Sequence, residues 1–312
     1  MRAAVKPPAL KTGETIAIVV PASPADEARL NRGARELERL GYKALYSTNA
    51  LARDGYFAAP LDLRRAEFLS ALAIGDYRAV FCARGGYGSG YLLEDLDPQL
   101  LRFPKIVLGY SDITALEIYL WQQFGWVTFY GPMVATGFDA GPDVPGGYDS
   151  ATLKRALTEA QRGWCYSLEG EPLARGEAAG VLLGGCLTLV ETTLGTPWEL
   201  DTDGAILLLE DRGMKPYQVD RALLHLKQAG KLTGVRGVIL GEFPECEPPV
   251  EGDPTVREVC GRILGELGVP VIWGAAIGHT PRAMLTVPLG VRARLRASGS
   301  GQLEILEPAV VA

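Results

Sequence analysis

Strand-like and helix-like stretches alternate along the first 140 residues of this 312-residue chain, and this alternation is what most restricts its fold. The expected strands are 15–22, 43–46, 79–83 and 105–110, and the expected helices are 25–40, 61–73 and 112–124. The longest of these strands are continuous apolar runs, which is typical of strands covered on both faces. Repeated β–α units predict a doubly wound parallel sheet with helices on both faces.

The second half has a different pattern. Three glycines and two prolines stand among residues 140–147, and such residues punctuate loops. We therefore expect an N-terminal α/β domain over 1–140, a linker over 141–178 and a mixed α/β C-terminal domain over 179–312. Within the C-terminal domain the expected strands are 205–210, 237–240 and 269–273, the expected helices are 217–229 and 255–267, and residues 285–306 alternate like a hairpin.

Composition argues against several classes of protein. The net charge of −6 argues against a nucleic-acid partner, and five cysteines without a C-x-x-C pair suggest neither a disulfide scaffold nor a zinc ribbon. The apolar run at 16–20 is shorter than the ~7–15 residues of a signal peptide and the ~20 of a membrane helix. We expect a cytoplasmic protein without a membrane partner, although a chain already freed of its signal peptide would look the same.

The segment Gly109-Tyr-Ser-Asp112 carries the strongest chemical signal. Ser111 follows an apolar strand at the edge where doubly wound sheets bind ligands. The helix that begins after it has free N–H groups that can stabilise an oxyanion. The arrangement resembles a nucleophile elbow, although Ile113 stands where the G-x-S-x-G pattern has its last glycine. The alternative is that Ser111 or Asp112 simply caps the helix.

A glycine-rich loop, Arg84 to Gly90, follows the strand at 79–83. Its paired glycines allow a ligand to approach the backbone closely, and exposed N–H groups can bind an anion. The spacing matches neither G-x-G-x-x-G nor a Walker loop, so a nucleotide site is weakly supported. A flexible connection between strand and helix is the alternative.

The chain has only two histidines, which excludes a site built from three. His279 lies in a loop framed by Gly278 and Pro281, a setting that suits a catalytic base, whereas His225 lies inside an amphipathic helix. Glu210 ends an apolar strand, where a carboxylate can orient an imidazole; solvent exposure or helix capping is its alternative. Ser111, Glu210 and His279 each follow an expected strand, which predicts an active site between the two domains.

Several motifs, in the same order and almost from end to end, resemble the LD-carboxypeptidase family, serine peptidases of the muramoyltetrapeptide carboxypeptidase type. These motifs are ARGGYG at 83–88, GYSDITAL at 109–116, YGPM at 130–133, GGCLTL at 184–189, LGTP at 194–197, LED at 209–211, the helix at 217–230, and GHT at 278–280. The resemblance implies that Ser111 is the nucleophile, with Glu210 and His279 completing a triad.

The resemblance also implies the reaction. Family members cleave the bond between the L-centre of a diamino acid and a terminal D-alanine in murein tetrapeptides. They act in the cytoplasm during cell-wall recycling, use no metal or cofactor, and are often dimers. An oxyanion hole is implied as well, formed by the backbone N–H groups of Asp112 and of a glycine in the loop, Gly86 beside Gly85.

Two positions qualify this expectation. Arg84 is a candidate for holding the substrate's free carboxylate because its guanidinium is a fork-shaped donor, although it could equally be a structural ion-pair partner. Many members have asparagine where this chain has Cys186, so specificity here can differ; its apolar surroundings argue against a nucleophilic Cys186. Two other functions stay open: hydrolysis of peptidyl-nucleotide toxins, as in the microcin-immunity branch of the superfamily, and non-catalytic ligand binding.

Overall fold

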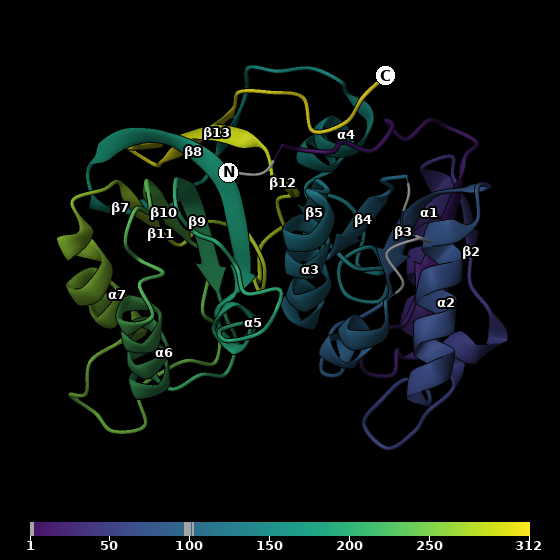
Figure 1. Cartoon of the computed structure of the whole chain (residues 1–312), viewed down its shortest axis with the longest axis horizontal. Coiled ribbons are helices and arrows are strands. Elements are labelled where there is room, and N and C mark those ends of the chain that lie inside the picture. Colours follow the sequence, from purple (N-terminus) through teal and green to yellow (C-terminus); the bar gives the residue numbers. More distant parts are fainter. Residues whose placement is uncertain (1–2, 97–100, 102) are drawn as a thin grey trace.

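The computed structural model describes residues 3–96, 101 and 103–312, and its strands form two sheets side by side (Figure 1). The first sheet, in the order β12–β5–β4–β3–β1–β2, contains β1 (Thr15–Val19), β2 (Lys43–Leu45), β3 (Tyr77–Cys82), β4 (Ile106–Gly109), β5 (Thr128–Tyr130) and β12 (Val287–Leu289). The second sheet, in the order β6–β14–β13–β8–β9–β10–β11–β7, contains β6 (Trp164–Ser167), β7 (Glu171–Ala174), β8 (Gly176–Cys186), β9 (Ala205–Glu210), β10 (Gly237–Leu240), β11 (Val271–Trp273), β13 (Arg292–Ala297) and β14 (Gln302–Ile305).

Helices cover both sheets (Figure 1). The α-helices are α1 (Glu27–Arg39), α2 (Leu61–Ala73), α3 (Thr114–Phe124), α4 (Ser150–Thr158), α5 (Leu187–Thr192), α6 (Pro216–Gln228) and α7 (Val256–Leu264). Short 3₁₀ helices are η1 (Thr48–Leu51), η2 (Ser89–Asp95), η4 (Ser111–Ile113) and η5 (Gly265–Leu267). The helix expected at 112–124 is therefore divided into η4 and α3, and the one expected at 255–267 into α7 and η5.

Strands β1 to β5 of the first sheet are parallel, as expected, and β12 is antiparallel at one edge. Side chains alternate between the two faces: Ile16 packs in the core that contains α1, and Val80 in the core that contains α2 and α3. This arrangement confirms helices on both faces of a parallel sheet. Helix α1 begins after Asp26, whose carboxylate accepts the Arg29 N–H.

The second sheet is mixed. Strands β8 to β11 are parallel at its centre, and antiparallel strands extend both edges. The segment 141–178, expected as a linker, contains α4, β6 and β7, and β6 and β7 form the two edges of this sheet. An edge strand is paired on one side only and tolerates polar residues, so its composition resembled that of a linker. The domain boundaries remain a prediction.

The hairpin expected over 285–306 forms only in part. Strands β13 and β14 form an antiparallel hairpin, but β12 leaves it and pairs with β5 of the first sheet. The second sheet's inner face contributes Ile206 and Leu208 to the same core as Phe129 and Val287. The C-terminal ends of β4 and β9 therefore approach one seam. No helix among the described residues is long and apolar enough to span a membrane.

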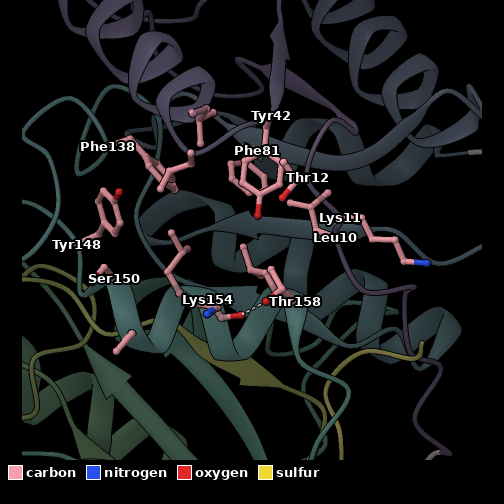
Figure 2. Close-up of a pocket in the computed structure, with 15 residues that line it drawn as sticks. Leu10, Lys11, Thr12, Tyr42, Phe81, Phe138, Tyr148, Ser150, Lys154 and Thr158 are labelled. Carbon is pink, nitrogen blue, oxygen red and sulfur yellow. Dashed lines mark hydrogen bonds between the residues drawn. The ribbon is translucent and has the colours of Figure 1, made fainter.

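Figure 2 shows a cavity of about 620 Å³ between the N-terminal segment, the end of α1 and α4. Its walls are mostly apolar, with Leu37, Phe81 and Phe138 among them. Helices α2 and α3 pack on one face of the first sheet, so α1 and α4 cover the other face. The cavity lies between these two covering helices. None of the site residues predicted from the sequence lines it.

Candidate active site

Ser111 lies at the turn from β4 into η4 and has a left-handed backbone, with φ = 64°. A non-glycine residue in this region is strained by about 1–2 kcal/mol, which is typical of a nucleophile elbow. Ile113, which stands where the elbow pattern has glycine, packs over Gly109: a Cβ atom at Gly109 would lie 2.7 Å from Ile113 Cγ2. The tight turn thus forms with the first glycine of the pattern and without the last.

Glu210 is fully buried at the end of β9 and receives three hydrogen bonds. Its Oε2 accepts the His279 backbone N–H at 2.8 Å and lies 2.7 Å from His279 Nδ1, and its Oε1 accepts the Tyr130 hydroxyl at 2.6 Å. Gly278 has φ = 79°, and a Cβ atom there would lie 2.2 Å from Glu210 Cδ. The glycine before His279 therefore lets the loop wrap around the carboxylate.

Tyr130 links the two sides of the seam. Its hydroxyl accepts the Ser111 backbone N–H at 3.2 Å and donates to Glu210. The Tyr110 ring, next to Ser111 in the chain, meets the His279 ring edge to face at 5.1 Å between centroids. The structure thus brings Ser111, Glu210 and His279 into one connected cluster. Tyr130 belongs to the YGPM motif, but nothing in the sequence assigned it a role.

Burial and charge act in opposite directions on these groups. Burial lowers the pKa of His279, but the adjacent Glu210 carboxylate raises it, and the net shift is upward. Burial and the same carboxylate raise the pKa of Tyr130 well above its usual value, so its hydroxyl stays protonated. With Nδ1 donating to Glu210, the neutral His279 ring has Nε2 as its basic nitrogen.

The glycine loop lies against Ser111. A Cβ atom at Gly85 would lie 3.3 Å from both Ser111 Oγ and the Asp112 backbone nitrogen. Ser23, which the sequence did not single out, holds this loop: its N–H donates to the Gly85 carbonyl at 3.2 Å, and its Oγ accepts the Tyr87 N–H at 3.1 Å. Gly86 has φ = 104° and no room for a side chain beside Ser23.

Asp112 and Arg84 use their side chains to hold structure. Burial raises the pKa of Asp112, and its Oδ2 accepts the Ser89 N–H at 2.8 Å, so the backbone N–H is the part of Asp112 that borders Ser111 Oγ. Arg84 is exposed and donates through Nη1 to the Pro24 carbonyl at 2.9 Å. No ion pair joins Arg84 to another residue in the described part of the chain.

The remaining sequence candidates are clearly placed. His225 is half-exposed on α6 and pairs with Glu191 at 2.9 Å, in agreement with its interpretation as a helix residue. Cys186 is buried and its pKa is raised well above the usual value by burial; its Sγ contacts Asp211 Oδ2 at 3.4 Å. Among the described residues, no group of three or more His, Cys, Asp and Glu side chains is arranged to hold a metal ion.

A second cavity, of about 580 Å³, opens between the two domains beside the glycine loop. Gly86, Tyr87 and Asp112 line it on one side, and Thr188 and Thr192 of α5 on the other. The size is typical of small-molecule sites. Arg64, a buried residue missed by sequence reasoning, supports this loop through an Nη1 hydrogen bond to the Gly88 carbonyl at 2.8 Å.

Comparison with known proteins identifies relatives over nearly the whole chain. The sequence model of the LD-carboxypeptidase N-terminal domain matches residues 16–131, and that of the C-terminal domain matches 179–295. A probable murein peptide carboxypeptidase from Bacillus subtilis is 37% identical over 298 residues, which cover 94% of this chain and 92% of that protein. Ser111 lies within the first matched segment, and Glu210 and His279 within the second.

Solved structures agree with this assignment. The muramoyltetrapeptide carboxypeptidase from Oxalobacter formigenes has a TM-score of 0.83 and 30% identity, with 94% of this chain and 99% of that chain covered. The protein MccF, in complex with glutamyl sulfamoyl guanosine, has a TM-score of 0.88 and 26% identity, with 98% and 100% covered. These similarities confirm the two-domain α/β fold.

Proposed function

The chain belongs to the LD-carboxypeptidase family and is a serine-type carboxypeptidase, and from that premise we propose that it cleaves the L,D bond to the terminal D-alanine of murein tetrapeptides through a triad of Ser111, His279 and Glu210. The observation that carries the proposal is the buried Glu210 carboxylate, which holds His279 by two hydrogen bonds and reaches the Ser111 backbone through Tyr130. The Glu210–His279 pair supplies the oriented base of a triad, and the Tyr130 bridge supports placing Ser111 beside it.

The proposed reaction follows triad chemistry. His279 Nε2 takes the proton of Ser111 Oγ as this oxygen attacks the scissile carbonyl carbon. Glu210 keeps the ring in the correct tautomer and stabilises the imidazolium. The tetrahedral intermediate collapses, His279 protonates the leaving amine of D-alanine, and an acyl-enzyme ester remains on Ser111. Water activated by His279 then hydrolyses that ester.

The glycine loop supplies the oxyanion hole in this proposal. Backbone N–H groups of Asp112 and Gly86 are the proposed donors, supported by the closeness of Gly85 to Ser111 Oγ and the Asp112 nitrogen. Losing one such donor costs about 3–4 kcal/mol of transition-state stabilisation. Arg84 remains the candidate for the substrate's terminal carboxylate, since its guanidinium is exposed near the loop.

Replacement of Ser111 tests the proposal. We expect Ser111→Ala to release no D-alanine above background from a murein tetrapeptide, measured by mass spectrometry, while its unfolding curve stays close to that of the parent. Ser70→Ala, on the exposed face of α2, is the matched control and should keep full activity. Full activity in Ser111→Ala would end the proposal.

A second candidate function is hydrolysis of a peptidyl-nucleotide toxin, favoured by the likeness to MccF. A direct comparison separates the two: D-alanine release from a tetrapeptide against cleavage of an aminoacyl-sulfamoyl adenylate by the same preparation. Labelling of Ser111 by a fluorophosphonate is expected in both cases, and its absence would favour non-catalytic binding at this site.

The setting of the enzyme is also proposed. We place it in the cytoplasm, where recycled muropeptides are available, and expect a homodimer without a cofactor, as implied by the family. Light scattering coupled to size-exclusion chromatography tests the dimer: a mass near twice 33.5 kDa is expected. A single-chain mass at micromolar concentration would contradict it.

A further inference from the structure

We infer that three exposed tyrosines, Tyr87 and Tyr91 in the lining of the interdomain cavity and Tyr56 against Tyr87, form a platform for the amino-sugar ring of a muropeptide. The inference rests on the proposed function and deepens it: the enzyme would prefer a tetrapeptide that still carries its muramoyl sugar over a free tetrapeptide. We call these three residues the tyrosine platform.

The tyrosine platform is unusual because large aromatic side chains are gathered on the surface. Tyr56, Tyr87 and Tyr91 are 61%, 51% and 50% exposed. Their rings touch: centroids are 5.7 Å apart for Tyr56 and Tyr87, and 6.0 Å apart for Tyr87 and Tyr91. Burial of an aromatic ring is favourable in free energy, so a contiguous cluster left exposed indicates a binding surface.

The platform is held rigidly from below. The Phe57 ring stacks on Tyr87 at 5.9 Å and meets the Tyr91 ring at 5.6 Å, and the guanidinium of buried Arg64 lies 4.5 Å from the centre of the Phe57 ring. The Tyr87 N–H is bound by Ser23 Oγ. A surface fixed before the ligand arrives loses little conformational entropy on binding.

The location ties the platform to the reaction. Tyr87 and Tyr91 line the cavity of about 580 Å³ that also reaches Gly86 and Asp112, the residues beside the proposed nucleophile. This volume is much larger than a terminal alanine needs. A substrate whose scissile bond lies at Ser111 can therefore extend along this cavity to the tyrosines.

The lining matches a neutral, hydroxyl-rich ligand. Four threonines line the wall opposite the tyrosines, and each donates its hydroxyl proton to an acceptor within the protein, so they offer a ligand acceptor oxygens. They are Thr188, Thr192, Thr193 and Thr196. The charged residues of the lining are Arg65, Glu94 and Asp112, and burial raises the pKa of the Asp112 carboxyl. A pyranose offers polarised C–H groups to the electron-rich face of an aromatic ring, and hydroxyl and acetamido groups to the threonines.

A nucleobase is the competing occupant because it also stacks on tyrosine. The Tyr87 and Tyr91 rings meet at an angle of 89°, so they do not form a parallel slot into which a flat base could slide. The threonine oxygens of the opposite wall can accept hydrogen bonds from the hydroxyl groups of a sugar. These two observations favour the pyranose.

The experiment compares kcat/KM for N-acetylmuramoyl-tetrapeptide and for the free tetrapeptide. We expect the parent enzyme to prefer the sugar-bearing substrate by about fivefold to tenfold, the gain of one aromatic contact. In the Tyr87→Ala/Tyr91→Ala double variant the ratio should fall close to one. Tyr217→Ala, which removes a tyrosine that is 59% exposed on α6, is the matched control and should keep the parent ratio.

Failure of this inference and failure of the proposed function look different. D-alanine released equally well from both substrates by the parent enzyme overturns the platform and leaves the function standing; no release from either overturns the function. A sugar preference that survives in the double variant also overturns the platform.

A binding measurement gives a result that does not depend on turnover. Saturation-transfer NMR of Ser111→Ala with N-acetylmuramic acid should show transfer to the sugar's ring protons, which the two tyrosine substitutions abolish. Transfer to guanosine monophosphate but not to the sugar would assign the platform to a nucleobase instead.

Discussion

The two halves of the candidate site are built in opposite ways. On the first-domain side, Ser111 has a left-handed backbone with φ = 64° and one backbone hydrogen bond to Tyr130. On the second-domain side, Glu210 is fully buried with three hydrogen bonds, and a glycine takes the left-handed position at Gly278. The backbone is thus strained at Ser111, which carries the candidate nucleophilic hydroxyl, and is unstrained at Gly278, beside the buried Glu210 carboxylate.

This difference predicts how each half responds to change. Removing the strain at Ser111 should stabilise the fold, since a residue that adopts φ = 64° without strain can keep the backbone hydrogen bond to Tyr130. Altering Glu210 should destabilise the fold, since its partners are buried and would lose their acceptor. Activity should fall in both cases, so stability is what distinguishes the two halves.

The largest effect is expected for Ser111→Gly. D-alanine release should fall by about 10⁶-fold, as for loss of a serine nucleophile. The free energy of unfolding should rise by about 1 kcal/mol, because glycine adopts φ = 64° without the strain that serine carries. Urea unfolding checks the stability against Ser111→Ala, which keeps the strain. Equal stability of the two variants would show that the serine backbone is unstrained.

Glu210→Gln should lower kcat by about 10⁴-fold, because the amide no longer stabilises the imidazolium and permits the wrong tautomer. It should also destabilise the fold by about 1–3 kcal/mol, since an NH₂ group would face donors that now bind a carboxylate. Kinetics and urea unfolding measure both effects, with the exposed Glu251→Gln as control. A stable, active Glu210→Gln would remove Glu210 from the site.

How far the sequence predicts the fold depends on what each strand packs against. The strands at 15–22 and 205–210 were predictable because burial on both faces requires continuous apolar runs. Strand β8 was missed because it is rich in glycine. A Cβ atom at Gly180 or Gly184 would lie 2.5 or 2.0 Å from the backbone of the neighbouring chain segment, so close approach replaced the apolar pattern with glycines.

The residues of the candidate site likewise divide into those that a local sequence pattern marks and those that only a long-range contact involves. Ser111, Glu210 and His279 could be predicted as candidates because each carries a reactive group at or beyond the end of an expected strand. Tyr130 was not, because its role comes from a contact with Glu210, 80 residues away in the chain. Ser23 likewise supports Tyr87 from 64 residues away. Residues that act through such long-range contacts have no local pattern to mark them.

Tyr130→Phe should test the link between the two halves. The change removes the hydroxyl that binds both Glu210 and the Ser111 N–H, so we expect a loss of about 1–3 kcal/mol in stability and about tenfold in kcat. Tyr166→Phe is the control: that tyrosine is also buried, but its hydroxyl donates to the Thr286 carbonyl at 2.7 Å and not to Glu210. It should lose stability but keep kcat. Equal kcat in both variants would mean that Tyr130 supports only the fold.

The smallest effect concerns pH. Burial has the largest single effect on the pKa of His279 and lowers it, but the Glu210 and Asp211 carboxylates together raise it, so the net shift is upward. Since the proposed base must be neutral, kcat/KM should rise with pH through a pKa above the usual value of about 6.5. A folded-state pKa above the unfolded one favours folding at low pH, so stability from this group should decline as pH rises through the folded pKa.

Glu210→Gln removes the larger of the two carboxylate effects that raise the pKa of His279, while burial and Asp211 remain. The acid limb of its residual activity should therefore move to lower pH, and the decline in stability with rising pH should disappear. Pre-steady-state kinetics and urea unfolding between about pH 5 and 9 measure both. Ser111→Ala should keep the parent's pH dependence of stability, because the Ser111 hydroxyl does not titrate in this range. If the activities of Glu210→Gln and of the parent rise with pH through the same pKa, the Glu210 carboxylate does not set the pKa of His279. The second-domain side of the site would then not be held electrostatically, and the contrast with the strained Ser111 side would fail.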